Sequence, residues 1–391
     1  MSLIKINNKK ESCSKTIADK FFLLGAFLGF FGTTYLGVHL LLMQIGIIQN
    51  NKDYEYYKII HILLQNYFFF GFFILGFFIQ AHHKIFEIEN LKPQKALLNI
   101  PISILGFIFI LISTNSTFAR FLIVVPFLYS LILLFKITKV CDLKKKITLC
   151  LPSLIGLLTF IILIFSNLTS TILSLLLLWS GSIAFIFVAG QQFVSGVLGC
   201  SKLSFRSGII FNFFYLSSII VLILFSTQTI SNNLYWRIFI VLSLSTILSF
   251  FFGCKIYKIN FAANKDVLKI AFPICLLWAI IGLIFSFDGV YKADKLIHIL
   301  ATGWLLPLII FVSSRVFNHF SNKNIFSDKI LIIFLFLWQI VPITRGLLHV
   351  ANPTLSYIMS FISLALLGLW TTGMIRGFYI INFAKIKEQK C

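Results

Sequence analysis

Seven histidines stand in a chain that is poor in charged residues, and four of them have positions that could form one site. His39, His61, His298 and His349 each fall near the same end of a long apolar run, so they are expected at one depth in a membrane. Ionisable groups within lipid are costly and usually functional. Imidazole is a common ligand of haem iron and copper. The pattern therefore predicts a metal site to which any of these four histidines could contribute a ligand.

Helical spacing supplies partners for this site, because residues four apart lie on one face of a helix. Asp294 precedes His298 by four residues and could fix its tautomer, which leaves the other ring nitrogen for a metal. Met43 follows His39 by four residues, and its soft sulfur suits copper(I). Arg345 could hold an anionic propionate or a carboxylate through two parallel hydrogen bonds.

The composition determines which elements can position these residues. Of 391 residues, 59% are hydrophobic and 12% are charged, about half the charged share of a soluble domain. Disordered chains are excluded as well, because they are poor in aromatic and aliphatic residues. The chain is therefore expected to be an integral membrane protein in contact with the lipid bilayer.

Apolar runs of about 20 residues, the length that crosses a bilayer as a helix, occur twelve times. The predicted spans are 21–49, 59–81, 97–113, 118–137, 148–166, 171–193, 206–226, 236–258, 268–287, 296–316, 329–348 and 354–383. The runs are too long and too uniformly apolar for a transmembrane barrel. We expect an all-α polytopic bundle that forms a single domain over 1–391, with tails at 1–20 and 384–391.

The basic residues indicate the orientation of the bundle. Only seven of the 33 Lys and Arg residues fall on the side opposite the termini: Lys52, Lys58, Arg120, Arg237, Lys292, Lys295 and Arg345. By the positive-inside rule both termini are cytoplasmic. The net charge of +21 is thereby explained by topology, and no nucleic-acid partner is needed.

The seven cysteines all fall on or near the predicted cytoplasmic side, which is reducing, so disulfides are not expected. The sequence contains no C-x-x-C pair, phosphate-binding loop, G-x-S-x-G or H-E-x-x-H motif. No catalytic residue can therefore be named, and enzyme activity stays open.

Several stretches together resemble the NnrS family. They are Phe21-Phe-Leu-Leu-Gly-Ala26, His61-Ile-Leu-Leu-Gln-Asn-Tyr67 with the glycines at 71 and 76, and the spacing of His298, Gly303, Arg315 and His319, with Arg345 in the next span. The length and the number of spans also agree. Two stretches depart from the family, which marks a divergent member: His82-His83-Lys84 replaces a Pro-Arg-Trp-like end, and Gly190-Gln-Gln-Phe193 replaces a Gly-Arg-x-x-Pro-like stretch.

The resemblance implies a haem- and copper-containing protein of the bacterial inner membrane that is linked to nitric oxide and nitrogen-oxide metabolism. It implies haem b and copper near the outer face, with His61 and His298 as ligands. It also adds Arg315 to Arg345 as a cofactor-binding residue and His319 as a metal ligand.

Two other functions fit the same residues. A secondary solute transporter also uses twelve helices, and intramembrane Arg and Asp can line its substrate path. A haem–copper oxidase-like enzyme would need closely spaced histidine pairs within the membrane. The only adjacent pair, His82-His83, is expected at the inner surface.

Overall fold

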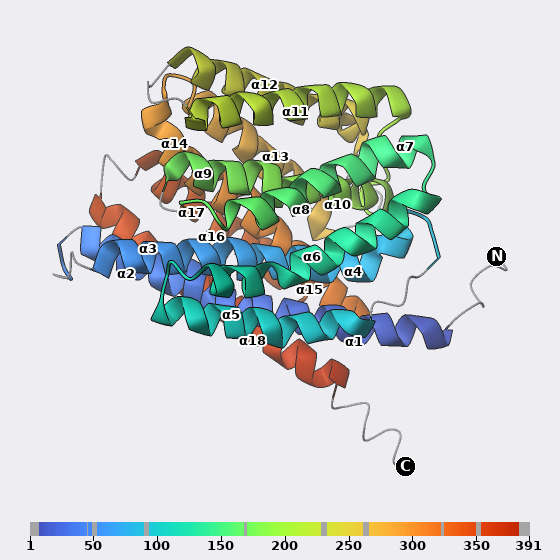
Figure 1. Ribbon diagram of the computed structural model, residues 1–391, viewed down its shortest axis with the longest axis horizontal. Coiled ribbons are helices and arrows are strands. Elements are labelled where there is room, and N and C mark those ends of the chain that lie inside the picture. The colour runs from blue at the N-terminus through green and yellow to red at the C-terminus, as the bar shows by residue number, and fades with distance from the viewer. Residues whose placement is uncertain are drawn as a thin grey trace.

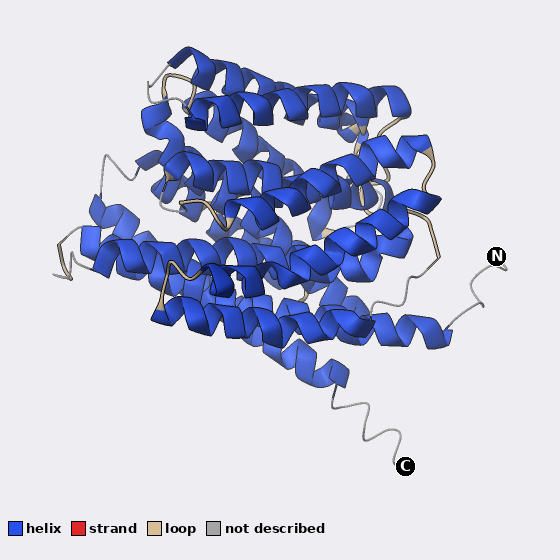
Figure 2. Ribbon diagram, in the orientation of Figure 1, coloured by secondary structure: helices blue, strands red, loops and turns tan. Residues whose placement is uncertain are grey.

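A computed structural model describes residues 8–44, 46–48, 53–89, 94–167, 170–227, 233–260, 266–321, 324–348 and 353–382. Helices joined by short loops make up the fold, and no strand occurs in these ranges (Figure 2). The buried apolar side chains of these ranges form one continuous hydrophobic core. The all-α bundle predicted from the sequence is confirmed.

Twelve helical segments of the described chain are long and apolar enough to cross a membrane, so the protein is a multi-pass membrane protein. We call them spans 1 to 12 in chain order. Their bounds are Asp19–Gln44, Tyr54–Ile85, Lys95–Ile112, Thr117–Val140, Leu143–Leu163, Thr171–Gly196, Phe205–Ser226, Asn233–Gly253, Val267–Phe285, Val290–His319, Asp328–Leu347 and Ser360–Ile381. Each one overlaps a predicted span.

Spans 2, 6 and 10 lie at the centre of the bundle, where 89%, 72% and 72% of the residues in their most apolar windows are buried. Spans 7 and 8 form a peripheral hairpin of α11 (Phe205–Thr227) and α12 (Asn233–Gly253), seen along the top edge in Figure 1. Large apolar side chains of this hairpin, such as Phe213 and Phe252, are exposed and would face lipid.

Helix α1 (Asn8–Gly29) begins and α18 (Pro353–Asn382) ends on the same side of the bundle, at the right in Figure 1. We call this the inner side and the opposite one the outer side. On the inner side, Glu87 forms ion pairs with Lys145 and Lys202, each at 3.0 Å. Hydrogen bonds from these two lysines hold the pKa of the Glu87 carboxyl below its usual value. The three residues connect segments that follow spans 2 and 6 to the start of span 5.

Six spans change from α-helix to π-helix for about one turn. These π turns are η1 (Phe30–Tyr35), η3 (Leu64–Phe70), η5 (Lys146–Cys150), η6 (Leu177–Ser182), η9 (Leu300–Leu305) and η10 (Ile343–Leu348), in spans 1, 2, 5, 6, 10 and 11. A π turn widens the helix and interrupts the regular hydrogen-bond ladder, and such turns occur frequently at functional sites.

Side chains of neighbouring spans bind carbonyl groups of three of these turns. His61 Nδ1 donates to the carbonyl of Gly32 in η1, and Tyr215 Oη donates to that of Ser180 in η6 at 3.1 Å. Trp338 Nε1 donates to the carbonyl of Thr302 in η9 at 2.8 Å. Lipid offers no hydrogen bonds, so these contacts between side chain and backbone join neighbouring spans inside the bundle.

The structure corrects the predicted depth of two histidines. Spans 2 and 10 begin at Tyr54 and Val290, earlier than the predicted 59 and 296. His61 and His298 therefore lie seven and eight residues inside their spans, about 10 to 12 Å along the helix axis, and do not open them. The difference arises because the polar residues that precede the apolar runs continue the same helices.

Candidate functional site

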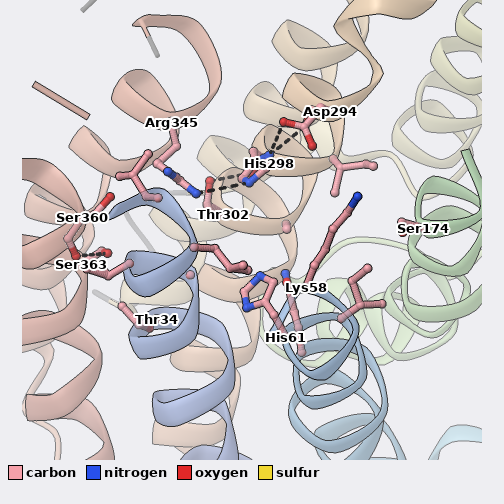
Figure 3. A pocket seen from close by; sticks show the side chains of 18 of the residues that line it. Thr34, Lys58, His61, Ser174, Asp294, His298, Thr302, Arg345, Ser360 and Ser363 are labelled. Carbon is pink, nitrogen blue, oxygen red and sulfur yellow. Dashed lines mark hydrogen bonds and ion pairs between the residues drawn. The ribbon is translucent and has the colours of Figure 1, made fainter. Parts of the chain in front are cut away.

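A cavity of about 200 Å³ with many polar side chains in its lining, the outer cavity, lies between spans 1, 2, 6, 10, 11 and 12 in the outer half of the bundle. The structure brings the predicted residues His61, His298 and Arg345 together there. They reach it from three different spans, as Figure 3 shows. The polar lining consists of Thr34, Gln44, Tyr54, Lys58, His61, Gln65, Asn66, Thr171, Ser174, Asp294, Lys295, His298, Thr302, Arg345, Ser360 and Ser363.

His61 is positioned by α3 (Tyr54–Leu63) and by the π turn of span 1. Because the Gly32 carbonyl can only accept, Nδ1 of His61 carries the proton in this contact. Gly32 permits the approach of the two spans, since a Cβ at this position would clash with the Cβ of Leu64. His61 is thereby fixed between two π turns, with its Nε2 as the remaining acceptor.

His298 is held on α14 (Ala293–Ile299) by its own helix. Nδ1 donates to the carbonyl oxygen of Asp294 at 2.8 Å, and the Asp294 carboxylate lies 3.5 Å from the same nitrogen. The predicted contact between Asp294 and His298 is therefore present. Nε2 of His298 accepts from Nη2 of Arg345 at 3.5 Å, which joins spans 10 and 11 across the cavity.

Arg345 lies in η10, the π turn of span 11. Within the described chain, His298 is its one hydrogen-bond partner and no carboxylate forms an ion pair with it. Gly346, the next residue, packs so closely against Ile299 that a Cβ there would clash with it. This contact holds η10 against the helix that carries His298.

The remaining predicted ligands lie elsewhere. Arg315 is 17 residues beyond His298 on the same span, about 25 Å along the helix, where it forms ion pairs with Asp266 at 2.8 Å and Asp328 at 3.7 Å. His319 is one turn further toward the inner side. Neither residue lines the outer cavity.

His39 does not line the outer cavity either. The His39 ring packs edge-on against Tyr57, with ring centroids 4.9 Å apart, although its neighbours Val38 and Leu40 line the cavity. His349 lies outside the described residues. Of the three described histidines that were expected at one site, the structure brings His61 and His298 together.

Several lining residues were not predicted, although helical spacing could have indicated them. Lys58, His61 and Gln65 recur at intervals of three and four residues in span 2, which places them on one helix face. Asp294, His298 and Thr302 repeat the pattern in span 10. Polar residues with this period inside a membrane span indicate a face directed at a polar interior.

Three observations argue against a haem or copper site in this cavity. Its volume of about 200 Å³ is below the roughly 300–1,000 Å³ of pockets that hold larger ligands. The acceptor nitrogen of His298 already faces the Arg345 guanidinium, so iron or copper bound there would meet a positive charge. The described residues also contain no cluster of three His, Cys, Asp or Glu side chains that could hold a metal ion.

A second, apolar cavity of about 90 Å³, the inner cavity, lies toward the inner side. Spans 1, 2, 6 and 10 line both cavities. On span 10, Leu306 lines the outer cavity and Leu305 the inner one, so the two cavities reach the same turn of this helix. Each of the four shared spans contains a π turn at the inner end of the outer cavity's lining, and residues of all four turns line that cavity: Thr34, Gln65, Asn66, Leu178, Ala301 and Thr302.

Comparisons with known proteins add no assignment. No protein-family model matches the chain, and no curated protein matches it.

Proposed function

We propose that the protein is a secondary transporter whose solute enters the outer cavity and passes along the central axis toward the inner side. One observation carries this proposal: the four spans that line both cavities all change to π-helix at the inner end of the outer cavity's lining. Transporters commonly bind their solute near the middle of the membrane, where helices are interrupted. We also propose that both termini are cytoplasmic and that the protein lies in a bacterial inner membrane.

The arrangement allows one site to be reached from two sides. The outer cavity has a mixed lining with many polar side chains, whereas the inner cavity has an almost wholly apolar lining that would resist water when closed. Interrupted helices can bend at the interruption, since the hydrogen bonds that stiffen a regular helix are weakened there. Motion at the four π turns would open the inner cavity and close the outer one around the solute.

The family resemblance to NnrS proteins is a less favoured second reading. It is supported by two imidazoles in one cavity, each with Nδ1 bound to a backbone carbonyl, an arrangement common among metal ligands. The position of Arg345 and the size of the cavity oppose it. We therefore derive no haem, copper or nitric oxide chemistry for these residues.

Labelling single cysteines from each side of the membrane tests the transporter proposal. In a variant without the seven native cysteines, Thr302→Cys places a thiol inside the outer cavity and Lys295→Cys places one nearer its outer end. A membrane-impermeant maleimide should label both from the outer side. In inverted vesicles it should also label Thr302→Cys, as the site becomes open to the inner side, but not the matched control Lys295→Cys. Labelling of Thr302→Cys from the outer side alone would exclude alternating access.

A further inference from the structure

We infer that the outer cavity binds a small monovalent oxyanion, of the size of a short carboxylate or nitrate. This inference names the solute of the proposed transporter and so rests on that proposal. Its basis is Arg345, a guanidinium directed into the cavity and held between spans 10 and 11.

Arg345 differs from Arg120 and Arg315 in its hydrogen-bond and ion-pair partners. Arg120 donates to three backbone carbonyl oxygens at 3.1 to 3.3 Å, and Arg315 forms ion pairs with two aspartates. Arg345 contacts only one neutral acceptor in the part of the chain that the structure describes, and does so at 3.5 Å. A guanidinium has five N–H donors, so most of its hydrogen-bonding capacity remains for a ligand.

The charges around the cavity indicate the charge of the ligand. Arg345, Lys58 and Lys295 line it, and they are opposed by Asp294 in the lining and by Glu55, which lies 3.6 Å from Lys58. Three cations and two carboxylates leave one positive charge without compensation when the histidines are neutral. One monovalent anion would balance it, whereas a cation would add to the excess.

The shape of the guanidinium indicates the chemistry of the ligand. Arginine presents parallel N–H groups that match two oxygens of a carboxylate or similar planar oxyanion, and lysine cannot reproduce this fork. An oxyanion would replace Nε2 of His298 as the acceptor of Arg345. Lys58 reaches into the same space from span 2, as Figure 3 shows, and supplies a second positive charge.

The size of the cavity limits the ligand further. A void of about 10–15 Å³ already admits one water molecule, so the cavity of about 200 Å³ has room for a compact anion together with waters. The cavity therefore fits an anion of a few heavy atoms.

Thermal unfolding of the purified protein in detergent tests the inference. Sodium formate, acetate and nitrate are each titrated at constant ionic strength against sodium gluconate, with sodium sulfate and the gluconate salts of other cations as comparisons. The unfolding midpoint should rise in a saturable way with the three small monovalent anions alone. Arg345→Gln should abolish the rise, and Arg345→Lys should weaken the apparent affinity at least tenfold. The matched control Arg315→Gln, which alters an arginine outside the cavity, should keep it.

An equal rise in Arg345→Gln and the wild type would overturn the inference, as would a rise with cations that depends on Arg345. If Arg345→Gln does not fold, the comparison of the wild type with Arg345→Lys and Arg315→Gln decides. The result is distinguishable from the transport test. If Thr302→Cys is labelled from both sides but no anion stabilises the protein, the transporter proposal stands and the anion inference fails. If anions stabilise the protein but Thr302→Cys is not labelled from the inner side, the anion-binding site stands and the transporter proposal fails.

Discussion

Replacing His61 by asparagine, glutamine and leucine should separate two roles of this imidazole. In the structure, Nδ1 of His61 donates to the Gly32 carbonyl in a π turn, and Nε2 is the acceptor that would serve as a metal ligand. The amide nitrogen of asparagine can occupy the place of Nδ1, whereas that of glutamine reaches the place of Nε2. Leucine matches asparagine in size and donates no hydrogen bond. We expect His61→Asn to be clearly more stable than His61→Leu, with His61→Gln close to the leucine variant.

The expected difference follows from the carbonyl that loses its donor. A buried polar group left without a partner costs about 1–3 kcal/mol. An unfolding entropy of roughly 2.1 cal/mol/K per residue amounts to about 0.8 kcal/mol/K for 391 residues. The unfolding midpoint of His61→Leu should therefore lie about 1–4 °C below that of His61→Asn.

Thermal unfolding of the three variants in one detergent, followed by intrinsic fluorescence, measures the difference. Equal midpoints for the asparagine and leucine variants would refute the role of His61 as the donor to the π turn. A glutamine variant that retains wild-type stability while asparagine loses it would show instead that Nε2 makes the important contact, as a metal ligand would.

Three further predictions can be checked with the same material. The purified protein, expressed with adequate haem supply, should show no Soret band and no stoichiometric iron or copper by elemental analysis; a Soret band that disappears in His298→Ala would restore the haem reading. Tyr215→Phe should lower the unfolding free energy by about 1–3 kcal/mol, because the Ser180 carbonyl in η6 loses its donor, while the exposed control Tyr257→Phe should leave it unchanged in denaturant titrations. Glu87→Gln should cost at most about 1 kcal/mol at pH 7, since the ion pairs are exposed. The folded pKa of Glu87 is below its usual 4.5, so its contribution is present above that value, and the difference between wild type and variant should shrink as the pH falls below it.

The twelve spans could be predicted from the sequence because a bilayer requires about 20 apolar residues for each helix, and each such run became a helix. The ends of spans 2 and 10 were less predictable. Their first turns contain Lys58 and Asp294, which hydropathy assigns to connections, but both residues line a polar cavity inside the bundle. A polar residue at such a position indicates that its side chain faces a cavity inside the bundle. It does not mark where the helix begins.

The candidate site was only partly accessible to sequence reasoning. Residue type and depth selected His61, His298 and Arg345, and the structure brings these three together. Arg315 could have been separated from them, since 17 residues of helix place it about 25 Å from His298. The π turns could not have been predicted, because they depend on contacts between spans, such as that of Gly32 with Leu64. The sequence of one span does not specify how it packs against another.

The extra residue in each π turn has a consequence for how the bundle could move. Adjacent residues point about 100° apart around an α-helix, and Leu305 and Leu306 already border different cavities at the end of η9. If the wide turn migrated by a few residues along span 10, the intervening segment would rotate by about this angle and advance by about 1.5 Å. Such a screw-like shift would change which residues of span 10 border each cavity without tilting whole helices. The bundle could then open and close the proposed solute pathway by local twisting, while the other helices stay in place.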